Sequence, residues 1–413
     1  MKHYHYYLEK ECRVQKLLLN EFKLKSEAIQ ISLYKFLFIF ISILIMSSFN
    51  SFANILDITS TAKQVVIYDH EVDKILFEKN SNEIMKPASM AKVMTAYIVF
   101  DRIKDGMLKM SDTFVVSNKA WRMGGSRSFL ELKSNVSISD LLMGLIVQSG
   151  NDAAVVIAEG ISGDEDAFAR EMNRYANLLN MKNTYFTNST GWPHPELKTT
   201  SKDLMILTKD IINKFPVLYS LFKEKTFKFN NIMQSNRNPL LYSINGADGL
   251  KTGYTNESGY GLIGSVKRNN RRVSIIINGL NSKTERTYES KRLIDIVFRE
   301  TVLLSLFKEK KTLTEANVWL GKTTKVNLIA QNNIKEIISP LQLNKTKINI
   351  VWNDPIAAPI KKGDKVGSIY IDIPGRNLIE DNLISSVNVD KLPSFMRIKS
   401  MLKFLLYGDI VAE

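Results

Sequence analysis

Ser89 and Lys92 are three residues apart in the chain, and together they could transfer an acyl group without help from a histidine. A serine hydroxyl becomes a nucleophile when an adjacent base removes its proton, and a neutral lysine amine can be that base. Burial, the positive end of a helix and a second cation nearby all lower the pKa of a lysine and favour the neutral amine. The spacing alone predicts little, because it also begins at five other serines, Ser32, Ser60, Ser220, Ser305 and Ser400.

Two further motifs lie downstream, and each is weak by itself. The Ser-Gly-Asn motif at Ser149–Asn151 places a hydroxyl and an amide at an interruption in an apolar helical region, where a buried polar group needs a partner or a task. The Lys-Thr-Gly motif at Lys251–Gly253 occurs once, on a predicted strand, and offers a cation and a hydroxyl. Its glycine would let a substrate backbone lie close to the strand. Three motifs in this order predict a serine acyl-enzyme.

The pattern of apolar residues predicts the elements that must position these groups. Pro87 suits the first turn of a helix, so Ser89 would lie where free backbone N–H groups can bind an oxyanion, with Lys92 on the same face. We expect strands at 64–68, 75–77, 250–254, 260–266 and 273–279, and helices from 87, over 140–160, over 164–181, from 201 and over 284–298. Helices inserted between strands predict an α/β unit with an antiparallel sheet over about residues 60–307.

A different pattern follows after about residue 310. Short apolar or alternating runs at 326–330, 334–339, 348–352 and 366–373 predict a small β-domain. The last segment, Ser394–Gly408, has the pattern of a basic amphipathic helix, which lies on a membrane surface rather than crossing it. An alternative is that this helix packs its apolar face on the β-domain.

The N-terminal region contains an apolar run of 11 residues at Phe36–Met46, followed by small residues before Asn54. We interpret it as a secretory signal peptide cut after Ala53, because spanning a bilayer takes roughly 20 apolar residues. The long segment before it leaves the true translation start open. The single cysteine, Cys12, lies before the cut, which excludes disulfides, thiol catalysis and zinc–thiolate sites in the mature protein. No cofactor or metal is expected.

The net charge of +14 favours anionic partners, such as phospholipid headgroups and acidic wall polymers. A composition rich in lysine, asparagine and isoleucine throughout would produce the same charge without such a partner. The sequence has no basic block interleaved with stacking aromatic residues, so a nucleic acid partner is not expected. The sequence predicts no oligomeric state.

Several segments together resemble the low-molecular-mass penicillin-binding proteins that are serine-type D-alanyl-D-alanine carboxypeptidases of the peptidase S11 kind. The segments are Lys86–Thr95, Ser149–Ala154, Asn188–Gly191, Ser235–Asn238 and Asp248–Thr255. The resemblance covers roughly residues 55–410. It implies an α/β (α+β) domain of the serine β-lactamase/transpeptidase type, with an antiparallel sheet and a helical subdomain, before an all-β domain and the amphipathic helix. The implied parts are residues 1–53 (extension and signal peptide), 54–307 (catalytic), 308–392 (β-domain) and 393–413 (membrane-surface helix).

The resemblance also implies roles for the residues of the first two motifs. Ser89 would be the nucleophile and Lys92 its general base. Ser149 would relay a proton to the leaving amine, and Asn151 would hold the substrate amide and orient Lys92. The substrate would be the stem peptide of peptidoglycan, from which the terminal D-alanine is removed. β-Lactams would acylate the same serine, and the resulting ester would be hydrolysed slowly.

For substrate binding, the resemblance implies that Lys251 and Thr252 receive the terminal carboxylate, with Gly253 beside them. Arg286, at the head of the closing helix, matches the place of an arginine that assists there in the family. The oxyanion hole would combine the N–H groups of Ser89 and Tyr254. Many relatives carry a histidine where this chain has Tyr254, which leaves its effect on hydrolysis open.

Several rival functions deserve comparison with this reading. A Ser-His-Asp hydrolase would need His70 or His194, which we expect to be solvated surface histidines. A class A β-lactamase needs a carboxylate for deacylation; Glu165, Glu171 and Glu196 fall in the right interval but lack its Glu-x-x-Leu-Asn context. A D,D-endopeptidase would share every catalytic residue, and a wall-binding protein without activity is a fourth possibility. The resemblance favours an exported enzyme attached peripherally to the periplasmic face of the bacterial inner membrane.

Overall fold

The computed structural model describes residue 56, residues 58–308 and residues 311–407. The predicted signal peptide, its cleavage site and Cys12 lie outside these residues. By its internal contacts the chain divides into Met1–Ala53 and Asn54–Glu413, and the description below concerns the second unit. In the part of the chain that the structure describes, no helix combines the length and the apolar character needed to cross a membrane.

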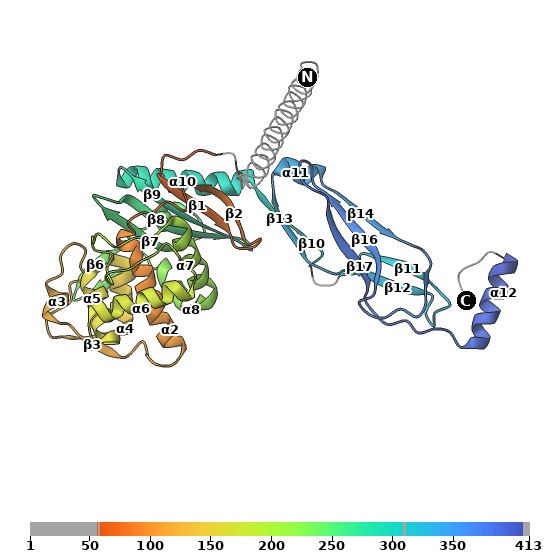
Figure 1. Ribbon diagram of the computed structural model, residues 1–413, viewed down its shortest axis with the longest axis horizontal. Coiled ribbons are helices and arrows are strands. Elements are labelled where there is room, and N and C mark those ends of the chain that lie inside the picture. The colour runs from red at the N-terminus through yellow and green to blue at the C-terminus, as the bar shows by residue number, and fades with distance from the viewer. Residues whose placement is uncertain (1–55, 57, 309–310, 408–413) are drawn as a thin grey trace, which may run out of the picture. The chain divides into compact units, whose positions relative to one another are not determined.

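The catalytic region is built on a five-stranded antiparallel sheet with the order β2-β1-β9-β8-β7 (Figure 1). The sheet brings the two ends of the region together, because β1 pairs with β9 as well as with β2. Its other edge is β7, which carries the Lys-Thr-Gly motif and pairs with β8 alone in this sheet. The strands are β1 Gln64–Asp69, β2 Lys74–Lys79, β7 Ala247–Thr255, β8 Gly259–Arg268 and β9 Arg271–Leu280.

The two faces of this sheet are covered by different elements. Alternate residues of a strand point to opposite faces, so in β1 Val66 and Tyr68 join the core beneath the helical subdomain. Val65 and Ile67 point the other way and pack with the inner side of α10, Lys283–Glu300. Figure 1 shows α10 along that face and α2, α5, α6 and α7 on the other, and Leu240 of the short helix α9 packs on the α10 side. The sheet is therefore buried on both sides, and its strands are correspondingly apolar.

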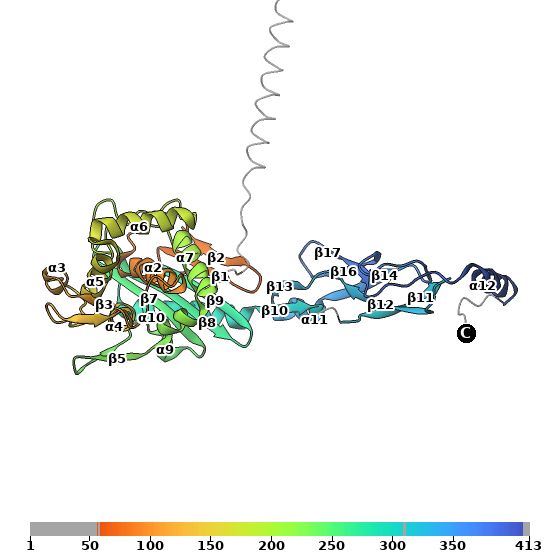
Figure 2. The ribbon, with the colours of Figure 1, turned by 90° about the horizontal axis from the view of Figure 1, so that it is seen from below.

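The helical subdomain surrounds α2, whose residues Lys92–Asp101 are all buried. A helix that is buried on every side must be enclosed by other elements, and α2 contacts α5, α6 and α7 (Figure 2). The helices are α2 Lys92–Lys104, α3 Asn118–Trp121, α4 Ile138–Met143, α5 Asn151–Ser162, α6 Glu165–Leu178, α7 Ser201–Lys214, α8 Pro216–Tyr219 and α9 Leu240–Ser243. Short turns and ribbons complete it, namely η1 Ala88–Ala91, η2 Gly144–Gln148, η3 Ser220–Lys223, β3 Thr113–Val115, β4 Asn135–Ser137, β5 Thr226–Phe229 and β6 Ile232–Ser235.

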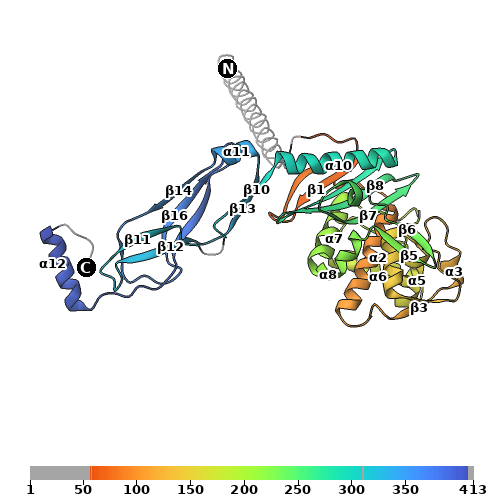
Figure 3. The same cartoon turned by 180° about the vertical axis from the view of Figure 1, so that it is seen from behind.

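The β-domain has its own sheet (Figure 3). It also has its own apolar core. Its six strands follow the order β14-β16-β17-β12-β11-β15, and β10 pairs separately with β13. The strands are β10 Val302–Leu306, β11 Thr314–Trp319, β12 Lys325–Ala330, β13 Ile334–Ile338, β14 Lys347–Trp352, β15 Ile356–Ala357, β16 Lys365–Asp372 and β17 Ile379–Ser385. Helix α11, Pro340–Lys345, joins β13 to β14, and helix α12, Ser394–Tyr407, follows β17.

The segment predicted as helical over 140–160 is divided in the structure, at the place where the sequence suggested an interruption. The segment contains α4, a π-helical turn and α5, with a break at Ser149 and Gly150. Ser149 has a left-handed backbone with φ 66°, which L-residues rarely adopt and which ends the preceding turn. Strand β10, which pairs with β13, was missed because it lies in a stretch that we left without an element between the closing helix and the β-domain.

Candidate active site

Ser89 lies on a short 3-10 turn, η1, directly before the buried helix α2. The sequence predicted that Ser89 and Lys92 share the first turn of one helix, whereas in the structure the 3-10 turn ends at Ala91 and α2 begins at Lys92. Side chains three residues apart eclipse each other in a 3-10 turn, so the two groups still meet. Lys92 Nζ lies 3.1 Å from Ser89 Oγ.

The amine of Lys92 is enclosed by acceptors and shielded from water. Besides Ser89, it donates to Asn151 Oδ1 at 2.7 Å and to the backbone carbonyl of Thr190 at 2.6 Å. The side chain is fully buried, and this burial, followed by the charge of Arg237, lowers the pKa of Lys92 to about 7. A lysine with that pKa is substantially neutral near pH 7 and can accept the proton of a hydroxyl.

The Ser-Gly-Asn motif occupies the break between the π-helical turn and α5. Ser149 Oγ accepts a hydrogen bond from Lys251 Nζ at 2.7 Å, which links the second motif to the third. Asn151 begins α5, and its Nδ2 donates to the carbonyl of Gly124 at 2.7 Å while its oxygen faces Lys92. The three motifs, far apart in the sequence, are therefore joined by direct hydrogen bonds.

Lys251 lies on β7 and is only 3% exposed. Burial lowers its pKa well below the ordinary value, and the charges of Lys92, Arg237 and Arg286 lower it further. Gly253, two residues along the same strand, packs against the turn that carries Ser89: a Cβ there would lie 2.9 Å from the carbonyl oxygen of Pro87. The glycine is thus required by contact inside the protein, in addition to any approach of a substrate.

A cavity of about 840 Å³ opens beside Ser89. Five consecutive residues of β7 and the turn after it, Thr252–Asn256, line one wall. Because β7 is an edge strand, its outer backbone groups can pair with an extended peptide laid along it. The other lining residues are Ser89, Gly125, Ser126, Ser149, Asn151, Thr190, Gly191, Trp192, Pro193, Arg237, Tyr260, Lys283 and Arg286. Because both apolar and polar residues line the cavity, it suits a short peptide substrate.

The charged residues that line the cavity are all cations: Arg237, Lys283 and Arg286. Arg286 is 7% exposed, its guanidinium lies 5.9 Å from the ring centroid of Tyr260, and its Nε makes no hydrogen bond with the described residues. Burial lowers the pKa of Arg286 to about 10, so the group remains charged at neutral pH. Tyr254 is 49% exposed and stacks on Tyr260 with 4.1 Å between ring centroids. The cavity therefore attracts an anionic group.

The residues needed by the rival functions lie elsewhere. His194 is exposed as expected, but the prediction of a solvated His70 is wrong: it is partly buried, bonds Ser274 Oγ at 2.8 Å, and burial lowers its pKa to about 4. Glu171 pairs with Arg102, and none of the three candidate glutamates is among the lining residues. Nothing in the described cavity supplies a histidine or a carboxylate to the reaction.

Sequence reasoning missed two groups that the structure brings to the site. The carbonyl of Thr190 contacts Lys92, and Arg237 lines the cavity and donates to Ser126 Oγ at 2.5 Å. Both lie in segments that we quoted for the resemblance without giving them a role. The available signal was their position in those segments, because a backbone carbonyl has no side chain by which it could be recognised.

Comparison with known proteins gives matches over both regions. The family model described as D-alanyl-D-alanine carboxypeptidase (peptidase S11) matches residues 51–283. The model described as penicillin-binding protein 5, C-terminal domain, matches residues 303–391. D-alanyl-D-alanine carboxypeptidase DacC of Escherichia coli K12 is 35% identical over 353 residues, which is 83% of this chain and 88% of the relative.

Solved structures give the same result. Penicillin-binding protein 5 of Haemophilus influenzae superposes with a TM-score of 0.65 at 32% identity, covering 81% of this chain and 99% of that one. The ampicillin-bound form of penicillin-binding protein D2 of Listeria monocytogenes matches with a TM-score of 0.54 at 28% identity, covering 59% of this chain and 99% of that one.

Proposed function

The chain belongs to the D-alanyl-D-alanine carboxypeptidase family and is a carboxypeptidase of this kind; we propose that Ser89 is its nucleophile and Lys92 its general base. One observation carries the assignment: the buried amine of Lys92 lies 3.1 Å from Ser89 Oγ, and its pKa is lowered to about 7. A base must be within hydrogen-bond reach of the proton it takes and largely neutral at the working pH. Lys92 satisfies both requirements.

The proposed reaction proceeds in two steps. Lys92 takes the hydroxyl proton as Ser89 Oγ attacks the carbonyl carbon of the penultimate D-alanine, and the N–H groups of Ser89 and Tyr254 stabilise the oxyanion. The C–N bond then breaks, and the proton taken by Lys92 is relayed through Ser149 to the leaving amine, so that D-alanine departs and Lys92 is neutral again. Water hydrolyses the remaining ester and restores the Ser89 hydroxyl. Asn151 holds the substrate amide and orients Lys92.

We propose that the terminal carboxylate of the stem peptide binds to Lys251, Thr252 and Arg286. The support is the electrostatics of the site, because the charged lining residues are cations and a carboxylate is the group that such a site prefers. Gly253 and Tyr254 continue the same strand and would pair with the peptide backbone. β-Lactams carry a carboxylate and a reactive carbonyl, so they would acylate Ser89 in the same orientation.

The two enzymatic alternatives are not equally supported. A class A β-lactamase reaction needs a carboxylate beside the ester to activate water, and none lines the cavity. We therefore expect the penicilloyl ester on Ser89 to persist. An endopeptidase would use the same residues, and a free terminal carboxylate on the preferred substrate is what would distinguish the carboxypeptidase.

We propose a catalytic part over 54–307, a β-domain over 308–392 and a membrane-surface helix over 393–413. Strand β10 lies before the second limit, although it pairs with β13 of the β-domain. The support for the membrane-surface helix is that α12 leaves apolar side chains in solvent: Phe395, Leu405 and Leu406 are 80%, 78% and 73% exposed. Arg397 and Lys403 would face anionic headgroups. An exported enzyme attached in this way would work at the periplasmic face of the inner membrane, next to its peptidoglycan substrate.

A labelled penicillin and a peptide ending in D-alanyl-D-alanine test the assignment together. Wild-type protein should become covalently labelled and should release D-alanine, and Ser89→Ala should lose both activities. Ser220→Ala is the matched control, because Ser220 and Lys223 have the same spacing on η3 but do not line the cavity. Labelling that persists in folded Ser89→Ala would refute the nucleophile, and rapid penicillin hydrolysis by the wild type would favour the β-lactamase.

A further inference from the structure

The loop between α6 and α7 contacts Lys92 and the residue before Ser89. Its Thr190 carbonyl accepts the shortest hydrogen bond of Lys92 Nζ, at 2.6 Å. The next residue, Gly191, has φ +76°, and a Cβ there would lie 1.8 Å from the carbonyl oxygen of Ala88, next to Ser89. The position of this loop therefore determines where the amine of Lys92 lies relative to the hydroxyl of Ser89.

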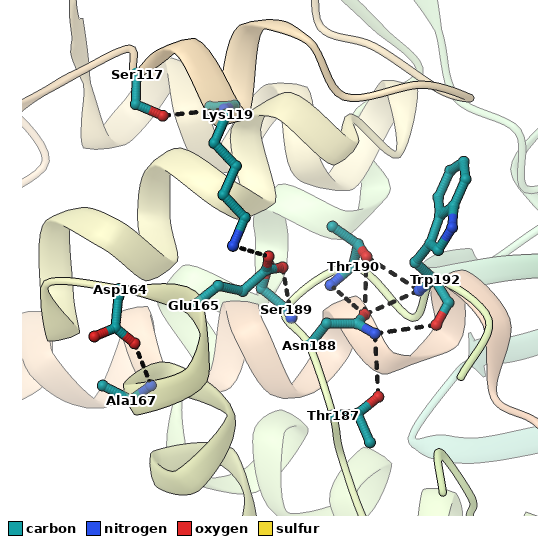
Figure 4. Close-up of polar contacts among 11 residues, drawn as sticks. Ser117, Lys119, Asp164, Glu165, Ala167, Thr187, Asn188, Ser189, Thr190 and Trp192 are labelled. Carbon is teal, nitrogen blue, oxygen red and sulfur yellow. Dashed lines mark hydrogen bonds and ion pairs between the residues drawn. The ribbon is translucent and has the colours of Figure 1, made fainter. Parts of the chain in front are cut away.

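Glu165 binds this loop from the first turn of α6 (Figure 4). One of its oxygens, Oε1, accepts hydrogen bonds from Ser189 Oγ at 2.8 Å and from Ser189 N at 3.3 Å. The other, Oε2, pairs with Lys119 Nζ of α3 at 2.9 Å. The N-cap of α6 is a different residue, Asp164, whose side chain accepts from Ala167 N. The carboxylate of Glu165 therefore binds the loop, whereas the side chain of Asp164 caps the helix.

Hydrogen bonds within the loop also hold its residues in fixed positions relative to one another. Asn188 Oδ1 accepts from Thr190 Oγ1 at 2.9 Å and from Trp192 N at 2.9 Å. Thr95 of α2 donates its hydroxyl to the carbonyl of Ser189 at 2.7 Å. Ser189 and Thr190 are both fully buried. Figure 4 shows Asn188 between Thr187 and Trp192, with Ser189 turned toward Glu165. Glu165 and Thr190 are therefore linked through one rigid turn.

We propose that Glu165, held by Lys119, is a positioning residue for the acyl transfer: it anchors Ser189 and so keeps the Thr190 carbonyl against the amine of Lys92. The inference rests on the proposed role of Lys92 as general base. Glu165 does not line the cavity, so it does not touch the substrate and acts through the loop.

The negative charge of Glu165 affects the pKa of Lys92. Asp152 of α5 and Glu165 of α6 raise the pKa of Lys92, against the larger effects of burial and Arg237 that lower it. Lys251 of β7 and Arg286 of α10 are further buried cations at the site. Near Glu165 itself, the acidic groups Glu159 and Asp166 act on Lys119. Neutralising Glu165 should therefore lower the pKa of Lys92 further, so that the amine becomes neutral at a lower pH.

The test measures the acylation rate by a labelled penicillin as a function of pH in full-length wild type, Glu165→Gln and Glu165→Ala. The glutamine keeps an acceptor for Ser189 but loses the charge, so the acid limb of its profile should move to lower pH by about half a unit. The alanine also loses the anchor, and its plateau rate should fall about tenfold. Glu171→Gln is the control, since Glu171 is another ion-paired acid of α6 that does not contact the loop.

A thermal unfolding measurement on each variant separates positioning from folding. The proposal is overturned if both Glu165 variants keep the wild-type rate and profile, or if the rates fall in step with unfolding while the acid limb stays in place. A shift that Glu171→Gln reproduces would also overturn it. Absence of labelling in the wild type would instead refute the role of Lys92 itself, which is a distinguishable result.

Discussion

The catalytic region and the β-domain bury different kinds of side chain. The catalytic region encloses Lys92, Lys251 and Arg286 together with the carboxylates of Asp152 and Glu165, all of them buried. In the described part of the β-domain, the buried polar residues are Asp381 and Ser385, and the rest of its core is apolar. Charged groups are rarely buried, because they lose hydration that protein contacts must replace.

This difference indicates what each region contributes. The hydrogen bonds of Lys92 and Lys251 to neighbouring side chains replace part of the lost hydration, but burial still lowers both pKa values. The catalytic region thus gives up stability for a neutral base and a positive cavity. Among the described residues of the β-domain, Asp381 is the buried carboxylate, and it accepts two hydrogen bonds from Asn332. The apolar core stabilises the domain through the hydrophobic effect. We therefore expect that replacing a buried lysine of the catalytic region lowers activity and raises stability. Truncating an apolar core residue of the β-domain should lower stability and leave activity unchanged.

The largest effect is expected for Lys92→Met, which keeps the volume of the side chain and removes its amine. Acylation by labelled penicillin should fall about a thousandfold, because the general base is lost. Stability should rise, since a folded-state pKa of about 7 against an ordinary 10.5 means that the folded protein holds the charged form at a cost. That cost is greatest at and below pH 7, and wild-type stability recovers as the pH rises toward 10.5.

The gain in unfolding free energy for Lys92→Met at pH 6 should be about 1–2 kcal/mol, because the lost hydrogen bonds to Asn151 and Thr190 offset part of it. Denaturant unfolding at pH 6 and pH 9 measures it, and the gain should shrink at the higher pH. A variant that is less stable than the wild type at both pH values would contradict the idea that the buried amine is costly.

The opposite result is expected for Ile369→Ala in the β-domain. Ile369 is fully buried in the apolar core, so the truncation should cost about 3 kcal/mol of unfolding free energy. Acylation per folded molecule should stay unchanged, because no residue of this domain lines the cavity. Chemical unfolding and penicillin labelling on the same sample measure both quantities. A loss of labelling in folded protein would show that the two regions are not independent, and Ile369→Val provides a milder control.

Sequence reasoning was most successful where chemistry depends on side-chain identity. Three motifs defined Ser89, Lys92 and Lys251, and the alternation of apolar residues predicted the strands of the sheet. The fold class is confirmed by the comparison with solved structures. The order of the motifs mattered more than any one of them, since Ser-x-x-Lys by itself occurs at five other places in the chain.

Reasoning from the sequence failed where the backbone carries the function. The path of the loop brings the carbonyl of Thr190 to the amine of Lys92, and this path depends on the buried contact between Ser189 and Glu165. The left-handed backbone of Ser149 is imposed by its neighbours, because serine has no intrinsic preference for it. For Gly253, the contact with Pro87 is a second reason that the sequence did not indicate, beside the predicted access for a substrate. Such features depend on three-dimensional packing, which local patterns do not encode.

The smallest effect is expected for Arg286→Gln, which tests whether a buried cation at the cavity wall serves specificity. Its Nε has no hydrogen-bond partner among the described residues, and its charge faces the cavity with Arg237 and Lys283. The ratio kcat/KM for a peptide with a free terminal carboxylate should fall about tenfold, because a charge-assisted contact is lost. A peptide with an amidated terminus should lose much less. Equal losses for the two peptides would assign Arg286 to the structure of the catalytic region instead, because a structural defect would not discriminate between a carboxylate and an amide.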